Sequence, residues 1–282
     1  MAYEFPPLVP GNAGVVARRV AAVLQDAWQR LSDQQTAVLA ALSETGRAPH
    51  VVGRLAEFQA AIADFQQRVD AEARAFVTRQ LPLLYEQGAQ QAAEALGGRF
   101  TWTLIHTEAL QSLASDSYAD FLRRSQEEQR MAAAFYRAVR ETARRELPLL
   151  AAGNTTALQA AKALAERLAA EHQLQYVVYR NGARMPVQAW AESATLAKSA
   201  VAYNSGTLNR AREAGVRWVQ VFDGAGCGWT NHRDTDKAAG TVRTVEDAAA
   251  WPISHPRCGR AFGARPELQP AQPTSRTSTS ST

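Results

Sequence analysis

The sequence predicts a predominantly helical α+β protein, in which long N-terminal helical hairpins precede a small α/β module with a Cys/His loop. Three observations predict this class. Apolar residues recur at intervals of three and four over the first 170 or so positions. β-branched and aromatic runs appear only after Leu174. Both cysteines then fall in one loop. We therefore predict an elongated helical domain at 1–173, a small α/β module at 174–265 and a disordered tail at 266–282.

The N-terminal region begins with an extended arm and continues as helices. Three prolines within residues 1–12 disfavour a helix there. From Ala13 a single apolar stripe runs through Trp28 to Leu42, and Gly46 with Pro49 ends it. The same periodicity and the same breakers, among them Pro82, Gly97, Pro148 and Gly153, predict further helices at 51–80, 83–96, 101–122, 126–147 and 155–172. Several exceed the average helix of a compact domain, which favours elongated hairpins.

The pattern changes after Leu174. Residues 175–179 (QYVVY) read as a short strand, and Asn181-Gly182 is a turn signal. Pro186 then opens a helix that Gly215 ends as its C′ residue. A second strand follows at 216–222, where Val and Trp alternate. Strand, helix and strand together predict one α/β unit, and the Cys/His loop follows its second strand directly.

Composition and sequence pattern limit the partners and the cellular compartment that we expect for the chain. The net charge is +4, from 31 basic and 27 acidic side chains, which does not by itself indicate a nucleic-acid binder. No run of about 18 apolar residues is present, so no membrane span is expected. The N-terminus lacks the layout of a signal peptide. We therefore expect a reducing cytoplasm, in which paired Cys and His residues more often bind a metal than form a disulfide.

The loop from Phe222 to Phe262 carries the candidate metal ligands. They form a Cys-x4-His pair and a His-x2-Cys pair, and the four predicted ligands are Cys227, His232, His255 and Cys258. Zinc in structural sites takes four sulfur or nitrogen ligands, so these residues predict a structural zinc that closes the module. A disulfide and a pair of buried thiols are the alternatives.

Two other interpretations of the same region remain open. Acidic and imidazole groups in the loop suit a hard metal or acid–base catalysis: Asp223, His232, Asp234, Asp236 and His255. A solvated turn has the same composition. Basic residues also accumulate in the C-terminal half, either as a solvated face or as a surface for phosphates or an acidic protein. They are Arg180, Arg184, Lys198, Arg210, Arg212, Arg217, Arg233, Lys237, Arg243, Arg257, Arg260 and Arg265.

Residues 176–262 resemble the C-terminal region of minor head proteins of tailed phages, the Mu F-like head morphogenesis and minor capsid protein 2 group. The matching features are a Gly-Arg opening followed by Pro-Val and an aromatic residue, a valine-rich strand ending in Asp, a Cys/His loop, and a closing His-Pro-x-Cys with Arg. In this chain they are Gly182, Arg184, Pro186, Val187, Trp190, Val219 to Asp223, Cys227, His232, His255, Pro256, Cys258 and Arg260. Two positions depart from the pattern: Ala197-Lys198-Ser199 replaces an Arg-Thr pair, and Gly259 follows Cys258 where Arg is usual.

This resemblance implies a minor structural protein of the virion or procapsid, made in the cytoplasm of the bacterial host. Its expected partners are the portal protein and the scaffolding or major capsid protein, with packaged DNA as a further contact through basic residues. The expected role is capsid assembly and head morphogenesis, without catalysis. The competing hypothesis is a phage-borne metal-dependent nuclease or an injected toxin-like enzyme that uses the Asp/His loop.

Overall fold

The computed structural model describes residues 11–45, 48–151, 155–179, 181–223 and 239–268, and these form two compact units. The helical unit contains residues 11–84 and 108–199, and the mixed unit contains residues 85–107 and 200–268. The helices are α1 (Gly11–Ala40), α2 (Ala48–Ala75), α3 (Leu81–Ala95), α4 (Leu104–Ala151), α5 (Thr155–Glu171), α6 (Val187–Glu213) and α7 (Val245–Ala250). The strands are β1 (Tyr176–Val178), β2 (Arg184–Pro186), β3 (Trp218–Phe222), β4 (Val242–Thr244) and β5 (Ala261–Ala264). The chain is therefore predominantly helical with a small α+β part, which confirms the predicted class.

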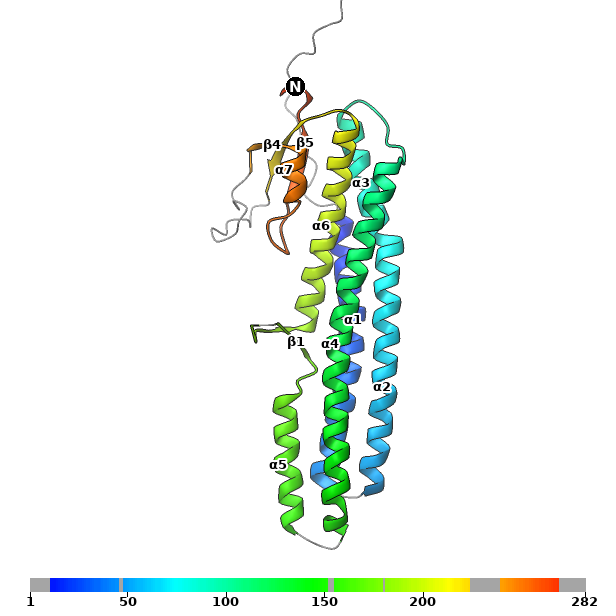
Figure 1. The fold of residues 1–282 in the computed structure, drawn as a ribbon, viewed down its shortest axis with the longest axis vertical. Coiled ribbons are helices and arrows are strands. Elements are labelled where there is room, and N and C mark those ends of the chain that lie inside the picture. The colour runs from blue at the N-terminus through cyan, green and yellow to red at the C-terminus, as the bar shows by residue number, and fades with distance from the viewer. Residues whose placement is uncertain (1–10, 46–47, 152–154, 180, 224–238, 269–282) are drawn as a thin grey trace, which may run out of the picture. The chain divides into compact units, whose positions relative to one another are not determined.

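The helical unit is built on a long hairpin. Helices α1 and α2 pack along their length, joined through a π-helical turn, η1 (Ala41–Thr45). Within this unit, α4 and α5 run alongside them (Figure 1). Leu42 in η1 and Ala161 and Ala165 in α5 are buried together. The apolar stripe predicted from Trp28 to Leu42 is thus buried against neighbouring helices.

Aromatic pairs hold the core of the helical unit. The rings of Trp28 and Phe65 of α2 meet edge to face at a centroid distance of 4.5 Å, and Phe58 meets Phe135 of α4 at 5.1 Å. Trp190 of α6 lies 6.0 Å from Trp28 and 6.2 Å from Phe121. Edge-to-face pairs of buried rings add to the burial of their apolar area.

Helix α4 differs from its prediction. The sequence predicted two helices, 101–122 and 126–147, whereas one helix of 48 residues runs from Leu104 to Ala151. The residues between the two predicted helices contain no Gly or Pro, and the polar Ser125 there is buried in the continuous helix. Pro148 lies inside the last turn, where the missing N–H removes only one bond before the helix ends.

Pro82 follows a second π-helical turn, η2 (Phe76–Gln80), between α2 and α3. The N–H of Leu81 donates to the carbonyl oxygen of Phe76, five residues earlier, so this turn is wider than an α-helical one. Pro82 has no N–H, so it cannot donate the hydrogen bond that would restore the α-helical pattern at its own position. The result is a local widening at the predicted kink.

A short turn that contains Asn181 and Gly182 joins β1 and β2 in the helical unit. The strands pair antiparallel, with Val177 opposite Met185. Gly182 adopts a φ of +79°, and the side chain of Asn181 accepts a hydrogen bond from the N–H of Ala183 at 3.1 Å. The Asn-Gly turn is therefore confirmed. The predicted strand–helix–strand unit is wrong, because β1 pairs with β2 whereas β3 belongs to a separate sheet.

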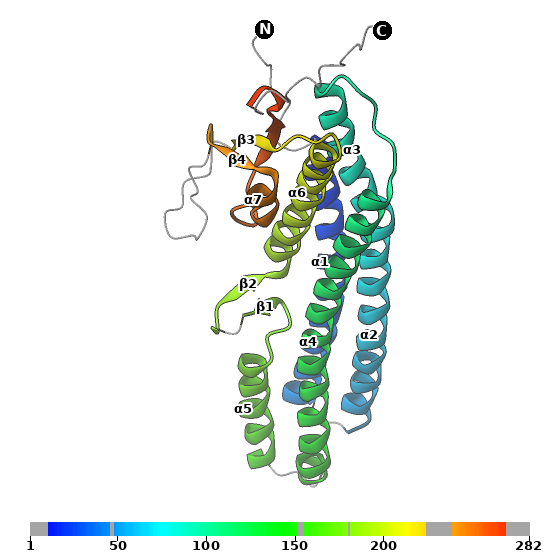
Figure 2. The same cartoon turned by 45° about the horizontal axis from the view of Figure 1, so that its top comes forward.

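The mixed unit contains an antiparallel sheet of order β4-β3-β5, with α7 beside β3 and β4 (Figure 2). Its buried cluster joins four elements. It comprises Leu208 and Ala211 of α6, Val219 and Val221 of β3, Val245 and Ala248 of α7, and Phe262 and Ala264 of β5, with Val216. The hydroxyl of Thr244 caps α7 by accepting the N–H of Asp247 at 3.1 Å. The sequence did not predict β4, α7 or β5.

Helices α3 and α6 approach each other closely within the mixed unit. A Cβ atom on Gly88 would lie 2.0 Å from the carbonyl oxygen of Tyr203, and one on Gly206 would lie 2.1 Å from that of Tyr85. The hydroxyl of Thr207 donates to the carbonyl oxygen of Gly88 at 3.1 Å. The absence of a side chain at both glycines is what allows the two backbones to touch.

Glycines end α3 and α6 as predicted. Gly97 and Gly215 have φ values of +74° and +73°. At the second site the N–H of Val216 donates to the carbonyl oxygen of Ala211, and the N–H of Gly215 to that of Arg212, both at 2.9 Å. Such paired bonds satisfy the last carbonyls of a helix.

The single boundary predicted at residue 173 stays a prediction, because the described units are grouped by contact and interleave along the chain. Residues 269–282 of the predicted tail lie outside the described residues, and 266–268 form a short 3-10 turn. No helix in the described ranges is both long and apolar enough to span a bilayer.

Candidate metal centre

His255 and Cys258 lie on one tight turn between α7 and β5, in the mixed unit. The N–H of Cys258 donates to the carbonyl oxygen of His255 at 2.9 Å, which closes the turn. The thiol of Cys258 is buried, and its Sγ lies 3.4 Å from the hydroxyl oxygen of Ser254. A thiol and an imidazole on one turn fit the donor set of half a zinc site. This half of the predicted ligand set is therefore compatible with the metal.

The loop that carries this turn is attached to α6 by Asn204. The side-chain amide of Asn204 donates to the carbonyl oxygens of Pro252 at 2.7 Å and Arg260 at 2.8 Å. These two acceptors flank the His255–Cys258 turn on either side. One amide group thus fixes both ends of the loop, and Asn204 itself is fully buried.

Arg260 connects the loop to the end of β3. Its Nε donates to Oδ1 of Asp223 at 2.6 Å and its Nη2 to Oδ2 at 3.2 Å, a two-pronged contact with a carboxylate. The Arg260 side chain is fully buried and that of Asp223 is 3% exposed. Arg260 also donates to the carbonyl oxygen of Trp251 at 3.2 Å. We call Asn204, Asp223 and Arg260 the polar clamp. Loss of one partner from such a buried pair typically costs about 3–5 kcal/mol.

The other two predicted ligands, Cys227 and His232, lie outside the described residues. Among the residues that are described, no group of three or more His, Cys, Asp and Glu side chains gathers in a way that suits a metal. The zinc site therefore stays a prediction, and so do its disulfide and buried-thiol alternatives. If bound, zinc would act as a cross-link between the two pairs of ligands.

The catalytic interpretation loses one of its groups. Both carboxylate oxygens of Asp223 accept from Arg260, so ionised Asp223 is engaged before any substrate or hard metal arrives. His232, Asp234 and Asp236 lie outside the described residues. The described contacts thus give Asp223 a structural role.

No family model matches the chain, and neither does any curated protein or solved structure.

Several of the basic residues singled out from the sequence have polar partners. Arg184 donates to Gln173, Lys198 to Asp120, Arg210 to Glu213, Arg212 to Asn209, and Arg265 to Glu267 and Gln220. Arg243 lies 3.8 Å from Asp247. Local pairing with carboxylates reduces the field that these residues present to phosphates. Arg180, Arg233 and Lys237 lie outside the described residues.

A second polar network in the mixed unit was not predicted. The hydroxyl of Tyr85 lies 2.9 Å from Nδ1 of His106, and Nε2 of His106 lies 3.3 Å from a carboxylate oxygen of Glu213. Asn209 donates to the same hydroxyl at 2.9 Å. Burial raises the pKa of Tyr85 to about 12, so the phenol stays protonated and available as a donor. His106 is fully buried with both ring nitrogens in contact, which indicates a structural link between α4, α3 and α6 in this unit.

The sequence offered partial signals for the residues it missed. Asn204 interrupts an apolar run in α6 (SAVAYNSGTL), and His106 follows an aromatic cluster (FTWTLIH). A polar residue in such a setting often becomes a buried hydrogen-bonding group. The pairing of Asp223 with Arg260 had no local signal, because 37 positions separate them.

Proposed function

We propose that the chain is a minor structural protein of a tailed bacteriophage head, which acts in capsid assembly and head morphogenesis and catalyses no reaction. Its partners in this proposal are the portal protein and the scaffolding or major capsid protein. Its location is the procapsid and then the virion. The chemical part of the proposal is a zinc held by Cys227, His232, His255 and Cys258, which closes the loop after β3.

The observation that carries the proposal is the contact between two separate parts of the phage-like motif. Asp223 ends the valine-rich strand of that motif, and Arg260 belongs to its closing His-Pro-x-Cys segment. The two form a buried ion pair beside Cys258. Residues that define the resemblance thus depend on one another physically, as a shared fold of this segment requires.

The opening of the motif supports the same proposal. Gly182 occupies the position of positive φ in the β1–β2 turn, where a side chain would be strained. Trp190 is buried against Trp28 and Phe121 in the helical unit. Gly182 thus has a role in the turn conformation and Trp190 a role in packing, whereas a catalytic motif would place reactive groups at a surface or cleft.

The long amphipathic helices favour an assembly role over a role in binding DNA. Exposed large apolar side chains occur on α1, α2 and α4, among them Val15, Val52 and Leu104. The basic residues, by contrast, are largely paired with acidic or amide groups. We therefore place protein partners before DNA in the proposal.

Depletion of the protein during infection tests the proposal. We expect a strong fall in DNA-filled heads, counted by electron microscopy, and rescue by the wild-type gene. Arg260→Met should fail to rescue, because it removes the guanidinium group that pairs with the buried carboxylate of Asp223. Arg54→Met is the matched control, since Arg54 is partly exposed on α2 and pairs with the exposed Glu57. Normal numbers of infectious, filled heads after depletion would reject the function.

A nuclease assay separates this proposal from the enzyme hypothesis. Purified protein is incubated with plasmid DNA and Mg²⁺ or Mn²⁺, and we expect intact plasmid. Cleavage by the wild type that disappears in His232→Ala would instead establish the enzyme.

A further inference from the structure

Arginines recur at every seventh position along the second half of helix α4. They are Arg123, Arg130, Arg137 and Arg144, and we call them the arginine stripe. Each of them is exposed. Because an α-helix rises by about 1.5 Å per residue, neighbouring members lie about 10.5 Å apart and the stripe is about 31 Å long. The stripe is therefore a nearly straight line of positive charge.

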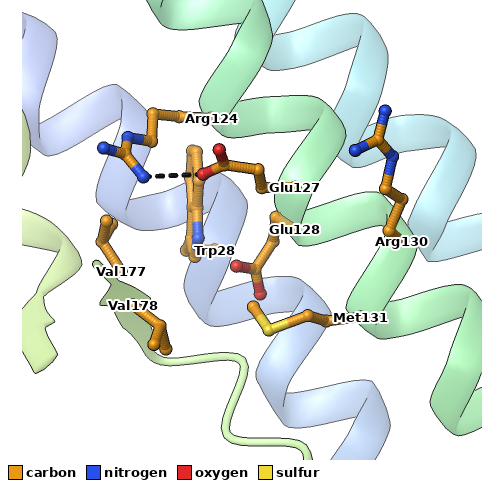
Figure 3. A pocket seen from close by; sticks show the side chains of 8 residues that line it. All are labelled: Trp28, Arg124, Glu127, Glu128, Arg130, Met131, Val177 and Val178. Atoms are coloured by element: carbon orange, nitrogen blue, oxygen red, sulfur yellow. Dashed lines mark hydrogen bonds and ion pairs between the residues drawn. The ribbon is translucent and has the colours of Figure 1, made fainter. Parts of the chain in front are cut away.

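The arginine stripe lies opposite the buried face of α4. Each member follows a buried residue by two positions, and these buried residues are Phe121, Glu128, Phe135 and Thr142. Two positions correspond to a rotation of about 200° around the helix axis, so the arginines point away from the core. Figure 3 shows this for Arg130, which lies on the other side of α4 from Glu128.

Arginines on the neighbouring helix α2 pair with carboxylates of their own helix. The pairs are Arg54 with Glu57, Arg68 with Asp64, and Arg74 with Asp70, at distances of 2.6–2.8 Å. The first member of the stripe does the same, since Arg123 lies 2.8 Å from Asp120. No described residue forms an ion pair with Arg130, Arg137 or Arg144. Most of the stripe thus carries charge that the described part of the helical unit does not neutralise.

The sequence around Arg130 explains why it lacks a pair. Glu127, three positions before it, already accepts from Arg124 at 2.6 Å (Figure 3). The residues three and four positions after it are Ala133 and Ala134. Ion pairs within a helix form at these spacings, so Arg130 has no free carboxylate on its own helix. The two alanines also leave room for another chain to approach the stripe.

Arg140 adds to the charge at the other end of the stripe. It is exposed and lies three positions after Arg137 and four before Arg144. Like charges at this spacing destabilise a helix. Glu141 is exposed beside them, so one carboxylate lies among three guanidinium groups. A partner that supplies carboxylates would relieve this repulsion.

A second α-helix with regularly spaced carboxylates is complementary to the stripe. A helix that runs alongside α4 presents the same face every seven residues, at the same interval of about 10.5 Å. Each carboxylate can then accept hydrogen bonds from one guanidinium group. We propose that the arginine stripe docks an acidic α-helix of another protein, which carries Glu or Asp at every seventh position.

Duplex DNA matches the stripe less well. Its strands wind around the axis with a repeat of about 34 Å, so a straight line of charge leaves the curved backbone after a short stretch. A nucleic acid would therefore engage part of the stripe, whereas a helix can engage all of it. The stripe would dock an acidic helix whether or not the chain belongs to a phage head. The test below and the depletion experiment can thus fail separately.

A designed helical peptide is the probe for this proposal. It has four heptads of alanine and glutamine, with glutamate at the first and fifth positions of each heptad, and carries a fluorescent dye. The full chain is titrated into it, and fluorescence anisotropy measures binding. We expect saturable binding at about 20 mM salt that weakens towards about 200 mM, because salt screens exposed charges. A control peptide of the same composition, with the glutamates distributed around the helix, should bind at least about fivefold more weakly.

Two triple variants locate the binding surface. The stripe variant combines Arg130→Gln, Arg137→Gln and Arg144→Gln. The control variant combines Arg54→Gln, Arg68→Gln and Arg74→Gln on α2, where each arginine already has a carboxylate. Both variants lower the net charge equally, and glutamine keeps a high helix propensity. We expect the stripe variant to bind the glutamate peptide at least about fivefold more weakly than the wild type, and the control variant to lose clearly less.

Four results would overturn the proposal. They are the absence of saturable binding at the lower salt, equal affinity for the two peptides, equal losses in the two variants, and tighter binding of a DNA duplex than of the glutamate peptide with a loss confined to the stripe variant. The last result would make the stripe a nucleic-acid surface instead. The comparison of the two peptides requires no variant, so it decides the question even if the stripe variant does not fold.

Discussion

The helical unit and the mixed unit are stabilised in different ways. In the helical unit, residues close in sequence share one helix face, and their rings meet across neighbouring helices, as Trp28 meets Phe65. In the mixed unit, the strands have three to five residues, and the loop between α7 and β5 is fixed by Asn204 and Arg260. A repeated apolar pattern therefore builds the first unit, whereas the second combines a small apolar cluster with a few specific polar contacts. Single substitutions should accordingly have larger effects in the mixed unit.

Removal of zinc is the change with the largest expected effect, if the four predicted ligands bind it. Apparent binding free energies of structural zinc reach about 10 kcal/mol or more at neutral pH. Freshly purified protein should contain about one zinc per chain, and a chelator should lower the unfolding temperature of the mixed unit. Elemental analysis and calorimetry measure the two quantities. Protein without zinc, or Cys258→Ser with an unchanged zinc content, would exclude the site.

Loss of the polar clamp comes next. Arg260→Ala should lower the free energy of unfolding by about 3–5 kcal/mol, because the buried carboxylate of Asp223 loses the guanidinium group that pairs with it. The double variant Asp223→Leu with Arg260→Met should recover much of this loss, since it removes both charges. Urea denaturation of the three proteins gives the comparison. A double variant no more stable than Arg260→Ala would refute the assignment of the loss to an unpaired charge.

The close contact of α3 with α6 can be tested with one methyl group. Gly206→Ala places a Cβ atom 2.1 Å from the carbonyl oxygen of Tyr85, so the helices must separate, at a cost of about 3 kcal/mol. Gly53→Ala is the control in the helical unit, where a Cβ meets nothing within 4 Å. It should raise the stability by about 0.5–1 kcal/mol through helix propensity. Equal effects at the two glycines would contradict the close packing.

The helical unit has its own sensitive position in Glu128. The folded protein holds the proton of this carboxyl group with a pKa of about 8, above the ordinary 4.5. The unfolded chain releases that proton first, so stability should fall as the pH rises from 4.5 to 8. Between pH 5 and 7 the loss is about 2–3 kcal/mol. Glu128→Gln should lack this component, and the difference between the two pH profiles measures it. Parallel profiles would mean that Glu128 titrates normally.

How much could be predicted from sequence follows the same division. The helices of the first unit, the Asn181-Gly182 turn, and the ends of α3 and α6 at Gly97 and Gly215 were predicted, because each depends on local periodicity or on the conformation of a glycine. The sequence analysis missed that α4 is one continuous helix. The polar residues between the two predicted helices resemble a linker as long as the residues that pack against them are unknown.

Only part of the candidate site could be predicted from the sequence. The His-x2-Cys spacing of His255 and Cys258 is visible in the sequence, and the structure places both residues on one turn. The ion pair of Asp223 with Arg260 and the packing of Gly88 and Gly206 against the other helix join residues far apart in the chain, and no local pattern encodes them. Strands β4 and β5 have only three and four residues, and each is stabilised by pairing with β3, which lies between them. Segments this short carry too little pattern to be predicted as strands from the sequence.

The contact of α3 with α6 has a practical consequence for expression of the C-terminal part. A fragment of residues 174–265 would lack Tyr85, Gly88 and Ala89, so the groove beside Gly206 and the hydroxyl of Thr207 would face water. Such a truncation should be prone to self-association. Residues 85–107 must accompany the C-terminal part if it is to be handled by itself.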